Sequence, residues 1–191
     1  IRKLQSKIIM GVTSVLLWKD NSEGHQGGHE GLIKFHDRIT TTLLGSYKES
    51  WNIHIKLFIN AKTEKRMNTT REMESILERL KNLWQVRQHT FYEGKTYIIG
   101  DFLVRVAAPK TAANYKGMLV EVEYISTINP YAAAPILSEF IEMLKSPEID
   151  IVQWEPNADD SFSKIGLSED TFTRAHTDYQ YMKLFKKWDL F

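Results

Sequence analysis

The stretch WNIHIKLFI, from Trp51 to Ile59, decides the fold that we expect for this chain. Apolar side chains occupy every second position, and polar side chains such as Asn52 and His54 fill the positions between them. This alternation is typical of a strand that is buried on one face only, and antiparallel sheets favour it. The segment therefore predicts an antiparallel sheet that turns one face toward a core.

Further strands are expected before and after this segment. Ile8 to Trp18 is apolar and β-branched, which indicates a buried strand. Met118 to Ile125 alternates again, and this pattern places Glu121 and Glu123 on the outward face. Glu93-Gly94-Lys95 predicts a hairpin turn between two short strands. Short turns rather than alternating helices join most of these strands, so the sheet is expected to be antiparallel throughout.

A helix is expected to end the chain. Ser168 has the side chain of an N-cap, and Glu169 and Asp170 would follow it in the first turn. Spacings of three and four predict one core-facing stripe in this helix: Phe172, Ala175, Tyr179, Met182 and Phe185. Tyr181 falls nearer the other face. We predict an α+β fold, an antiparallel β-barrel (curled sheet) flanked by helices, formed by residues 1–191 as a single domain.

The composition limits the classes of function. The chain has 191 residues, is 42% hydrophobic and 26% charged, and has a net charge of +1. This balance gives no reason to expect nucleic acid or an anionic membrane as partner. The chain contains no cysteine, so it has no thiolate chemistry and no disulfide framework. It has no apolar run near the roughly 18 residues of a membrane span and no apolar core of a signal peptide, so we expect a cytosolic or nuclear location without a membrane partner.

The segment EGHQGGHEG, from Glu23 to Gly31, is the strongest candidate for a metal site. His25 and His29 are four residues apart, a spacing that binds zinc well on one face of a helix. Gly27 and Gly28 lie between them and disfavour a helix. The glycines also match no phosphate-binding motif. We interpret the segment as a solvated strand-to-helix connection, and we expect no metal ligand and no cofactor.

No catalytic residue is predicted elsewhere. The sequence contains no G-x-S-x-G motif, and no histidine has a visible catalytic partner. Basic clusters at Lys62–Arg66 and Lys183–Lys187 lack the broad positive face of a nucleic-acid-binding protein. Two alternatives stay open on this basis: a metal-dependent enzyme that uses His25 and His29, and a nucleic-acid-binding module.

Four segments, in order along the chain, resemble a known family. They are MGVTSV at Met10–Val15, YIIGDFLVRV at Tyr97–Val106, YKGMLVEVEY at Tyr115–Tyr124 and DYQYMKLF at Asp178–Phe185. Together they are similar to the signatures of the Mediator complex subunit 20 family. The resemblance reaches from near the start of the chain to near its end. Residues 1–9 precede the usual Met-Gly-Val-Thr start, and the Glu23–Gly31 segment matches no motif of the family.

The resemblance implies a β-barrel flanked by helices and a non-enzymatic role in the nucleus. It implies a structural subunit in the head module of Mediator, and Mediator is a coactivator of RNA polymerase II transcription. The implied partners are Mediator subunit 18 in a heterodimer, the C-terminal part of Mediator subunit 8, the TATA-binding protein and the RNA polymerase II machinery. Direct sequence-specific binding of nucleic acid is not expected.

Four aromatic or basic residues are candidates for the partner interface. Trp, Tyr and Arg carry a large share of the affinity in protein interfaces. Trp84, Arg87 and Tyr92 lie in a predicted strand of mixed polar and aromatic character, and Trp188 lies on the last helix, away from its predicted core stripe. The alternative for Trp84 is a place in the core, and for Arg87 an ordinary surface position.

Overall fold

The computed structural model describes residues 11–20, 27–60, 66–69, 84–110, 117–145, 149–153 and 162–188. In chain order the elements are β1 (Val12–Asp20), α1 (Gly27–Asp37), the π-helical η1 (Arg38–Thr42), β2 (Ser46–Asn60), β3 (Arg66–Thr69), β4 (Trp84–Ile99), β5 (Phe102–Pro109), β6 (Met118–Tyr124), α3 (Pro130–Leu144), β7 (Ile149–Gln153), the 3-10 turn η4 (Phe162–Ile165) and α4 (Arg174–Trp188). In these ranges no helix is both long and apolar enough to cross a membrane.

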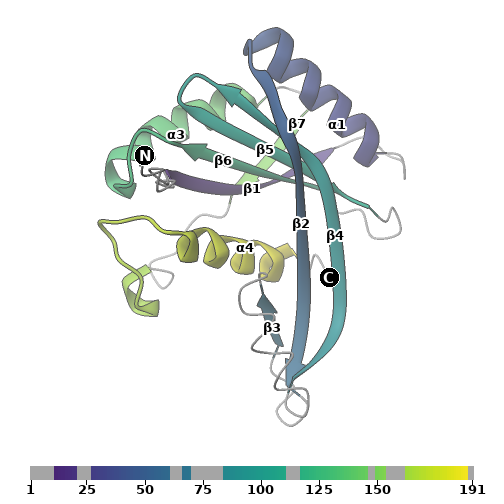
Figure 1. Cartoon of the computed structure of the whole chain (residues 1–191), viewed down its shortest axis with the longest axis vertical. Helices are drawn as coiled ribbons and strands as arrows, with labels where there is room; N and C mark the ends of the chain where they lie inside the picture. The colour runs from purple at the N-terminus through teal and green to yellow at the C-terminus, as the bar shows by residue number, and fades with distance from the viewer. Residues whose placement is uncertain are drawn as a thin grey trace, which may run out of the picture.

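In the described part of the chain, one antiparallel sheet has seven strands in the order β3-β2-β4-β5-β6-β1-β7 (Figure 1). The predicted α+β class with a curled antiparallel sheet and flanking helices is confirmed. The sheet is open, however, and not a closed barrel, because its edge strands β3 and β7 do not pair. β3 pairs only with Lys56–Ile59, near the end of β2. In Figure 1 the ribbon of β2 and β4 carries β3 far from β7.

The predicted hairpin turn at Glu93-Gly94-Lys95 is wrong, because β4 runs without a break from Trp84 to Ile99. Gly94 lies inside the strand, opposite Trp51 of β2 and Ala107 of β5. A Cβ atom at Gly94 would come within 1.8 Å of the backbone oxygen of Val106. The glycine therefore permits a close approach of β5 to β4, which is one of the known roles of glycine inside a strand.

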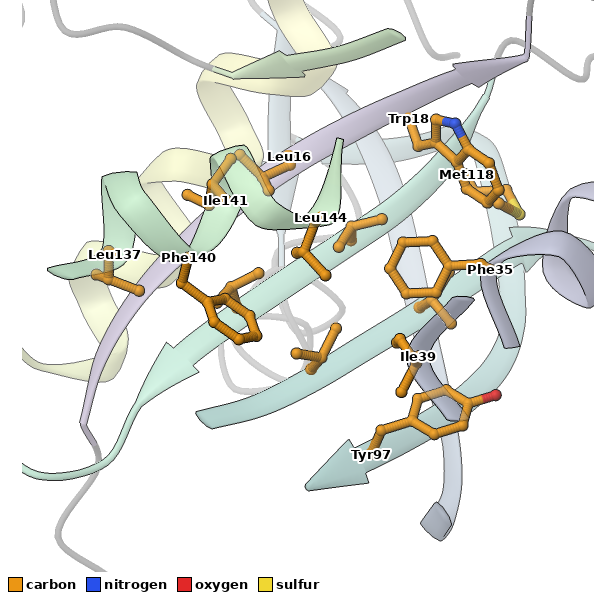
Figure 2. Packing of buried hydrophobic residues seen from close by; sticks show 14 of the residues in the cluster. Leu16, Trp18, Phe35, Ile39, Tyr97, Met118, Leu137, Phe140, Ile141 and Leu144 are labelled. Atoms are coloured by element: carbon orange, nitrogen blue, oxygen red, sulfur yellow. The ribbon is translucent and has the colours of Figure 1, made fainter. Parts of the chain in front are cut away.

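The first face of the sheet is covered by α1, η1 and α3. Figure 2 shows Phe35 of α1 and Ile39 of η1 directed toward Trp18 and Tyr97, while the side chains of α3 fill the other half of the cluster. Each strand contributes every second residue to this cluster, among them Leu16, Trp18, Val104, Val106, Met118, Val120 and Val122. Burial of this many large apolar side chains is the main force that fixes the three helical segments to the sheet.

The opposite face is covered by α4. Leu184 and Phe185 pack there against Leu17, Tyr92 and Leu119 in a second cluster. Figure 1 shows α4 on this side, while α1 and α3 lie on the other. Both faces of the sheet centre are thus buried, so the outward position predicted for Glu121 and Glu123 is wrong: these residues are 9% and 5% exposed. Their alternation with the apolar residues of β6 is correct, but α4 covers the second face as well.

The last helix begins later than Ser168 and turns a different face to the core. Ser168 Oγ accepts hydrogen bonds from the backbone N–H groups of Asp170 and Thr171, and thus caps a turn that precedes α4. The buried residues of α4 are His176, Thr177, Gln180, Tyr181, Leu184 and Phe185. The prediction is confirmed for Phe185. It is wrong for Tyr181, which is buried, and for Ala175 and Met182, which are exposed. Gln180 and Tyr181 make polar contacts with the sheet from this buried face.

Arg38 joins η1 to the end of α3. Its Nε donates to the carbonyl oxygen of Leu144 at 3.0 Å, and its Nη2 donates to those of Met143 at 2.7 Å and Lys145 at 2.6 Å. The last carbonyl groups of a helix have no partner within the helix. The guanidinium therefore satisfies them and fixes α3 beside η1.

Candidate functional site

The glycine-histidine segment is partly helical. α1 begins at Gly27, so His29 lies in its first turn, whereas His25 lies outside the described residues. The predicted connection up to Gly31 is wrong in its second half. Burial of Phe35 in the first cluster stabilises α1 enough to override the low helix propensity of the glycines. Within the described ranges, no three His, Asp or Glu side chains gather to hold a metal ion.

Two partly or fully buried histidines have structural partners. His36 Nδ1 lies 2.9 Å from the hydroxyl of Tyr97. His176 is buried, and its Nδ1 accepts a hydrogen bond from the backbone N–H of Thr173 at 3.0 Å. Its Nε2 therefore carries the proton and donates to the carbonyl oxygen of Ser168 at 2.7 Å. His176 thus ties the first turn of α4 to the turn before it.

A buried charged network connects the sheet to α4. Arg105 of β5 makes ion pairs with Glu121 and with Glu123 of β6, the latter at 2.8 Å. Glu121 also accepts a hydrogen bond of 2.7 Å from the hydroxyl of Tyr181 on α4. Glu123 accepts another, of 2.9 Å, from the backbone N–H of Gly11. Each carboxylate is therefore held by the guanidinium and by one further donor, which is what a buried charge requires.

The environment of this network changes two pKa values. Burial raises the pKa of Tyr181 well above its usual value, and the charge of Glu121 raises it further. Burial alone would lower the pKa of Arg105, but the charges of Glu121 and Glu123 outweigh it, so the net shift is upward. The tyrosine therefore stays a donor and the arginine stays a cation, and neither group is set to exchange a proton near neutral pH.

Gln180 closes part of a sheet edge. β7 pairs with β1 only from Leu16 to Asp20. Beyond that point, the Gln180 side chain accepts from the backbone N–H of Val15 and donates to the carbonyl oxygen of Thr13, both at 2.8 Å. The amide thus takes the place that another strand would fill. This need for a polar residue on the sheet side of α4 explains why the buried stripe includes positions 180 and 181.

The four segments that carried the family resemblance meet at this network. They contribute Gly11, then Arg105, then Glu121 and Glu123, and finally Tyr181. Sequence reasoning missed this cluster. A usable signal was present, because an Arg and two Glu residues stand at alternate positions of otherwise apolar strands. Opposite charges on neighbouring strands stabilise one another.

The four residues predicted for the partner interface differ in their position and burial. Trp84 and Arg87 lie in β4, but their side chains lie outside the described residues. Tyr92 is 3% exposed and packs edge-on against Phe185, so it is a core residue of this chain. Trp188 is half-buried beside the second cluster.

Other apolar side chains are more exposed than these. On the outer side of α3, Tyr131 is 65% exposed and Met143 is 49% exposed. Leu44, between η1 and β2, is 84% exposed and has a left-handed backbone with a φ of 54°. Leucine rarely adopts this conformation, and strained residues of this kind cluster at functional sites.

The sequence matches a protein family. Residues 67–186 match the family described as TATA-binding related factor (TRF) of subunit 20 of Mediator complex. A curated relative from Schizosaccharomyces pombe, Mediator of RNA polymerase II transcription subunit 20, is 29% identical over 125 residues, which cover 54% of this chain and 64% of the relative. Mediator subunit 20b from Arabidopsis thaliana is 28% identical over 113 residues, covering 57% of this chain and 51% of the relative. Both matches span less than two thirds of the relatives' own length.

Solved structures show a weaker likeness. A conserved hypothetical protein from Pyrococcus furiosus aligns with a TM-score of 0.45 and 12% identity, over 73% of this chain and 95% of the other. A Pyrococcus horikoshii protein aligns with the same TM-score and 11% identity, over 73% and 94%. Likeness at this level has no bearing on function.

Proposed function

Because this chain belongs to the Mediator subunit 20 family, we propose that it is a non-enzymatic structural subunit of the Mediator coactivator of RNA polymerase II transcription. Its place is the head module, and its location is the nucleus. Residues 1–191 act as a single domain. Its direct partner is Mediator subunit 18, with which it forms a one-to-one heterodimer.

The observation that supports this role is how the chain uses polar residues of the segments that resemble the family. Arg105, Glu121 and Tyr181 have the side chains that an active site would need, but Arg105 and Tyr181 both bind Glu121 inside the protein. Their arrangement holds α4 on the sheet. A chain that uses these residues to build its own scaffold is expected to act through its surface.

Two further partners follow from the same proposal. The C-terminal part of Mediator subunit 8 joins the heterodimer to the rest of the head module, and the complex contacts the TATA-binding protein. The exposed apolar side chains of α3 and of the turn at Leu44 are surfaces on which such contacts can form. A lasting interface buries well over about 1,000 Å² in total.

The test is co-expression of this chain with Mediator subunit 18, followed by size-exclusion chromatography with light scattering. We expect one species with the mass of a one-to-one complex, which survives dilution to micromolar concentration. Each chain run alone provides the control. Separate elution of the two chains would overturn the proposed partnership.

A further inference from the structure

One side of β2 is open along part of its length. β4 pairs with β2 on one side throughout, but on the other side β3 reaches only Lys56–Ile59. In the described part of the chain, no strand pairs with this side before Lys56. A bulge interrupts the strand between Tyr47 and Glu49, and from Ser50 to Ile55 the pairing with β4 is regular. Alternate backbone groups of Ser50–Ile55 therefore point outward without a strand partner.

β1 also has a part of its edge that no strand pairs with in the described residues, but a side chain fills it. There the side-chain amide of Gln180 bonds to the backbone of Thr13 and Val15, where β7 ends. The backbone edge of β1 is thus satisfied by the protein itself. The edge at Ser50–Ile55 has no such substitute among the described residues, although its backbone groups are equally able to form hydrogen bonds.

The side chains along this edge define what can bind. Trp51 and Ile53 face α4, where they are half-buried against the second cluster. Ser50, Asn52 and His54 face the opposite way and are exposed. An added strand would lie beside both rows. Its own side chains would have to alternate between apolar residues next to Trp51 and Ile53 and polar residues on the other face.

The outer face adds a charge preference. The ring of His54 lies edge-on to Phe91 at 4.3 Å between centroids. The ammonium group of Lys110 lies 5.2 Å from the centre of the same ring and pairs with Glu93 at 3.0 Å. Lys95 is exposed on this face as well. These groups carry more positive than negative charge, so acidic side chains fit the polar positions of the added strand.

The protective devices of edge strands are missing from this segment. Natural sheets protect open edges with lysines, prolines and bulges. Here the bulge and the charged residues Lys48 and Glu49 come before the open segment. Ser50–Ile55 itself contains no lysine, no proline and no bulge. An unprotected edge with an apolar row is a template for another strand.

We propose that the edge of β2 at Ser50–Ile55 is a docking site for an extended segment of a partner protein, which joins the sheet as an additional strand. The segment alternates apolar residues with acidic or polar ones. Binding by strand addition takes its affinity from main-chain hydrogen bonds and its specificity from the alternate side chains. This inference rests on the proposed function, because it names the surface at which Mediator subunit 18 binds.

The experiment compares per-residue amide exchange in the isolated chain and in its complex with Mediator subunit 18. In the isolated chain, alternate amides from Ser50 to Ile55 should exchange fast, and in the complex they should become at least about tenfold slower. Slow exchange of these amides already in the isolated chain would overturn the inference, because the chain itself or a second copy would then fill the edge. Binding of subunit 18 without a change at these amides would also overturn it, while the proposed function would stand.

A pair of variants supplies a second measurement. Ile53→Lys places a charge on the apolar row of the edge and should weaken binding of subunit 18 by about tenfold or more. Ile33→Lys makes the same change at an exposed position of α1 and should leave the affinity within about twofold. Equal affinities of the two variants would contradict the inference. If the parent chain does not bind subunit 18, the proposed function fails and the docking site fails with it.

Discussion

The hydroxyl of Tyr181 donates a hydrogen bond of 2.7 Å to Oε2 of Glu121, and this contact joins α4 to the ion pair inside the sheet. Arg105 holds the other oxygen of the same carboxylate. Glu121 thus receives one donor from the neighbouring strand and one from the helix. The helix is positioned by a directional polar contact as well as by apolar burial.

Removal of this hydroxyl is expected to weaken the fold. Tyr181→Phe keeps the ring but leaves one oxygen of the buried Glu121 without its donor. The cost of an unsatisfied buried group predicts a loss of about 1–3 kcal/mol in the free energy of unfolding. Urea denaturation measures this as a lower midpoint with an unchanged slope.

Tyr131→Phe is the matched control for this variant. The hydroxyl of Tyr131 also donates to a carboxylate, that of Glu169 at 3.3 Å, but this pair is exposed on the surface. Water can replace the lost partner, so the midpoint should stay at the parent value. Equal midpoints for the two variants would show that the buried contact has no special weight.

Loss of the Gln180 amide, or its replacement by a carboxylate, is expected to destabilise the fold. Gln180→Met leaves the backbone N–H of Val15 and the carbonyl of Thr13 without partners, which predicts a loss of about 1–3 kcal/mol per buried group. Gln180→Glu keeps the acceptor for Val15 but places an anion against the carbonyl oxygen of Thr13. It should therefore be the less stable variant at neutral pH and recover at low pH, where the carboxyl is protonated. Unfolding curves at pH 7 and pH 4 test this order, and a Glu variant as stable as the parent at pH 7 would contradict it.

Alkaline pH is expected to unfold the chain through its buried tyrosines. A tyrosine in an unfolded chain ionises near pH 10. Burial raises the pKa of Tyr97 to about 12, with smaller effects from Tyr47 and Asp37, and burial also raises the pKa values of Tyr92 and Tyr181. Because the folded values lie above the unfolded one, the stabilisation is complete below about pH 10 and falls as the pH rises toward 12.

Absorbance of the phenolate, followed together with circular dichroism, measures this effect. The buried tyrosines should titrate in the same step in which the fold is lost, well above pH 10. Tyr181→Phe should make the loss of stability between pH 10 and 12 less steep. Titration of all tyrosines near pH 10 in a chain that stays folded would contradict the prediction.

The part of the fold that depends on local pattern could be predicted from the sequence. Trp51 to Ile59 alternates because one row of β2 faces the core side, and a period of two residues is visible without any other part of the chain. The antiparallel arrangement followed from the short connections. The same reasoning predicts one more short strand from Ile149 to Trp154, and β7 (Ile149–Gln153) lies there.

Contacts between distant segments could not be predicted in this way. Gly94 has a local signature of a turn, but it serves the approach of β5 to β4, which involves residues more than ten positions away. The alternation of Glu121 and Glu123 with apolar residues would be the same if their face were exposed to water or covered by α4. Only the opposite charge of Arg105 on the paired strand indicated a buried network, and that signal needs the register of β5 and β6 to be known.

The sequence pattern and the structure differ in which residues of α4 they place in the core, and stability measurements can distinguish them. The pattern placed both Met182 and Phe185 in the core, whereas the structure buries Phe185 to 1% exposure and leaves Met182 36% exposed. Phe185→Ala should therefore lower the free energy of unfolding by about 3–5 kcal/mol, because it removes a ring that packs against Tyr92 and Tyr181. Met182→Ala should change it by only about 0.5 kcal/mol or less. Thermal melts of the two variants measure the difference, and a Met182 variant that melts as low as the Phe185 variant would mean that α4 is rotated relative to the structure described above.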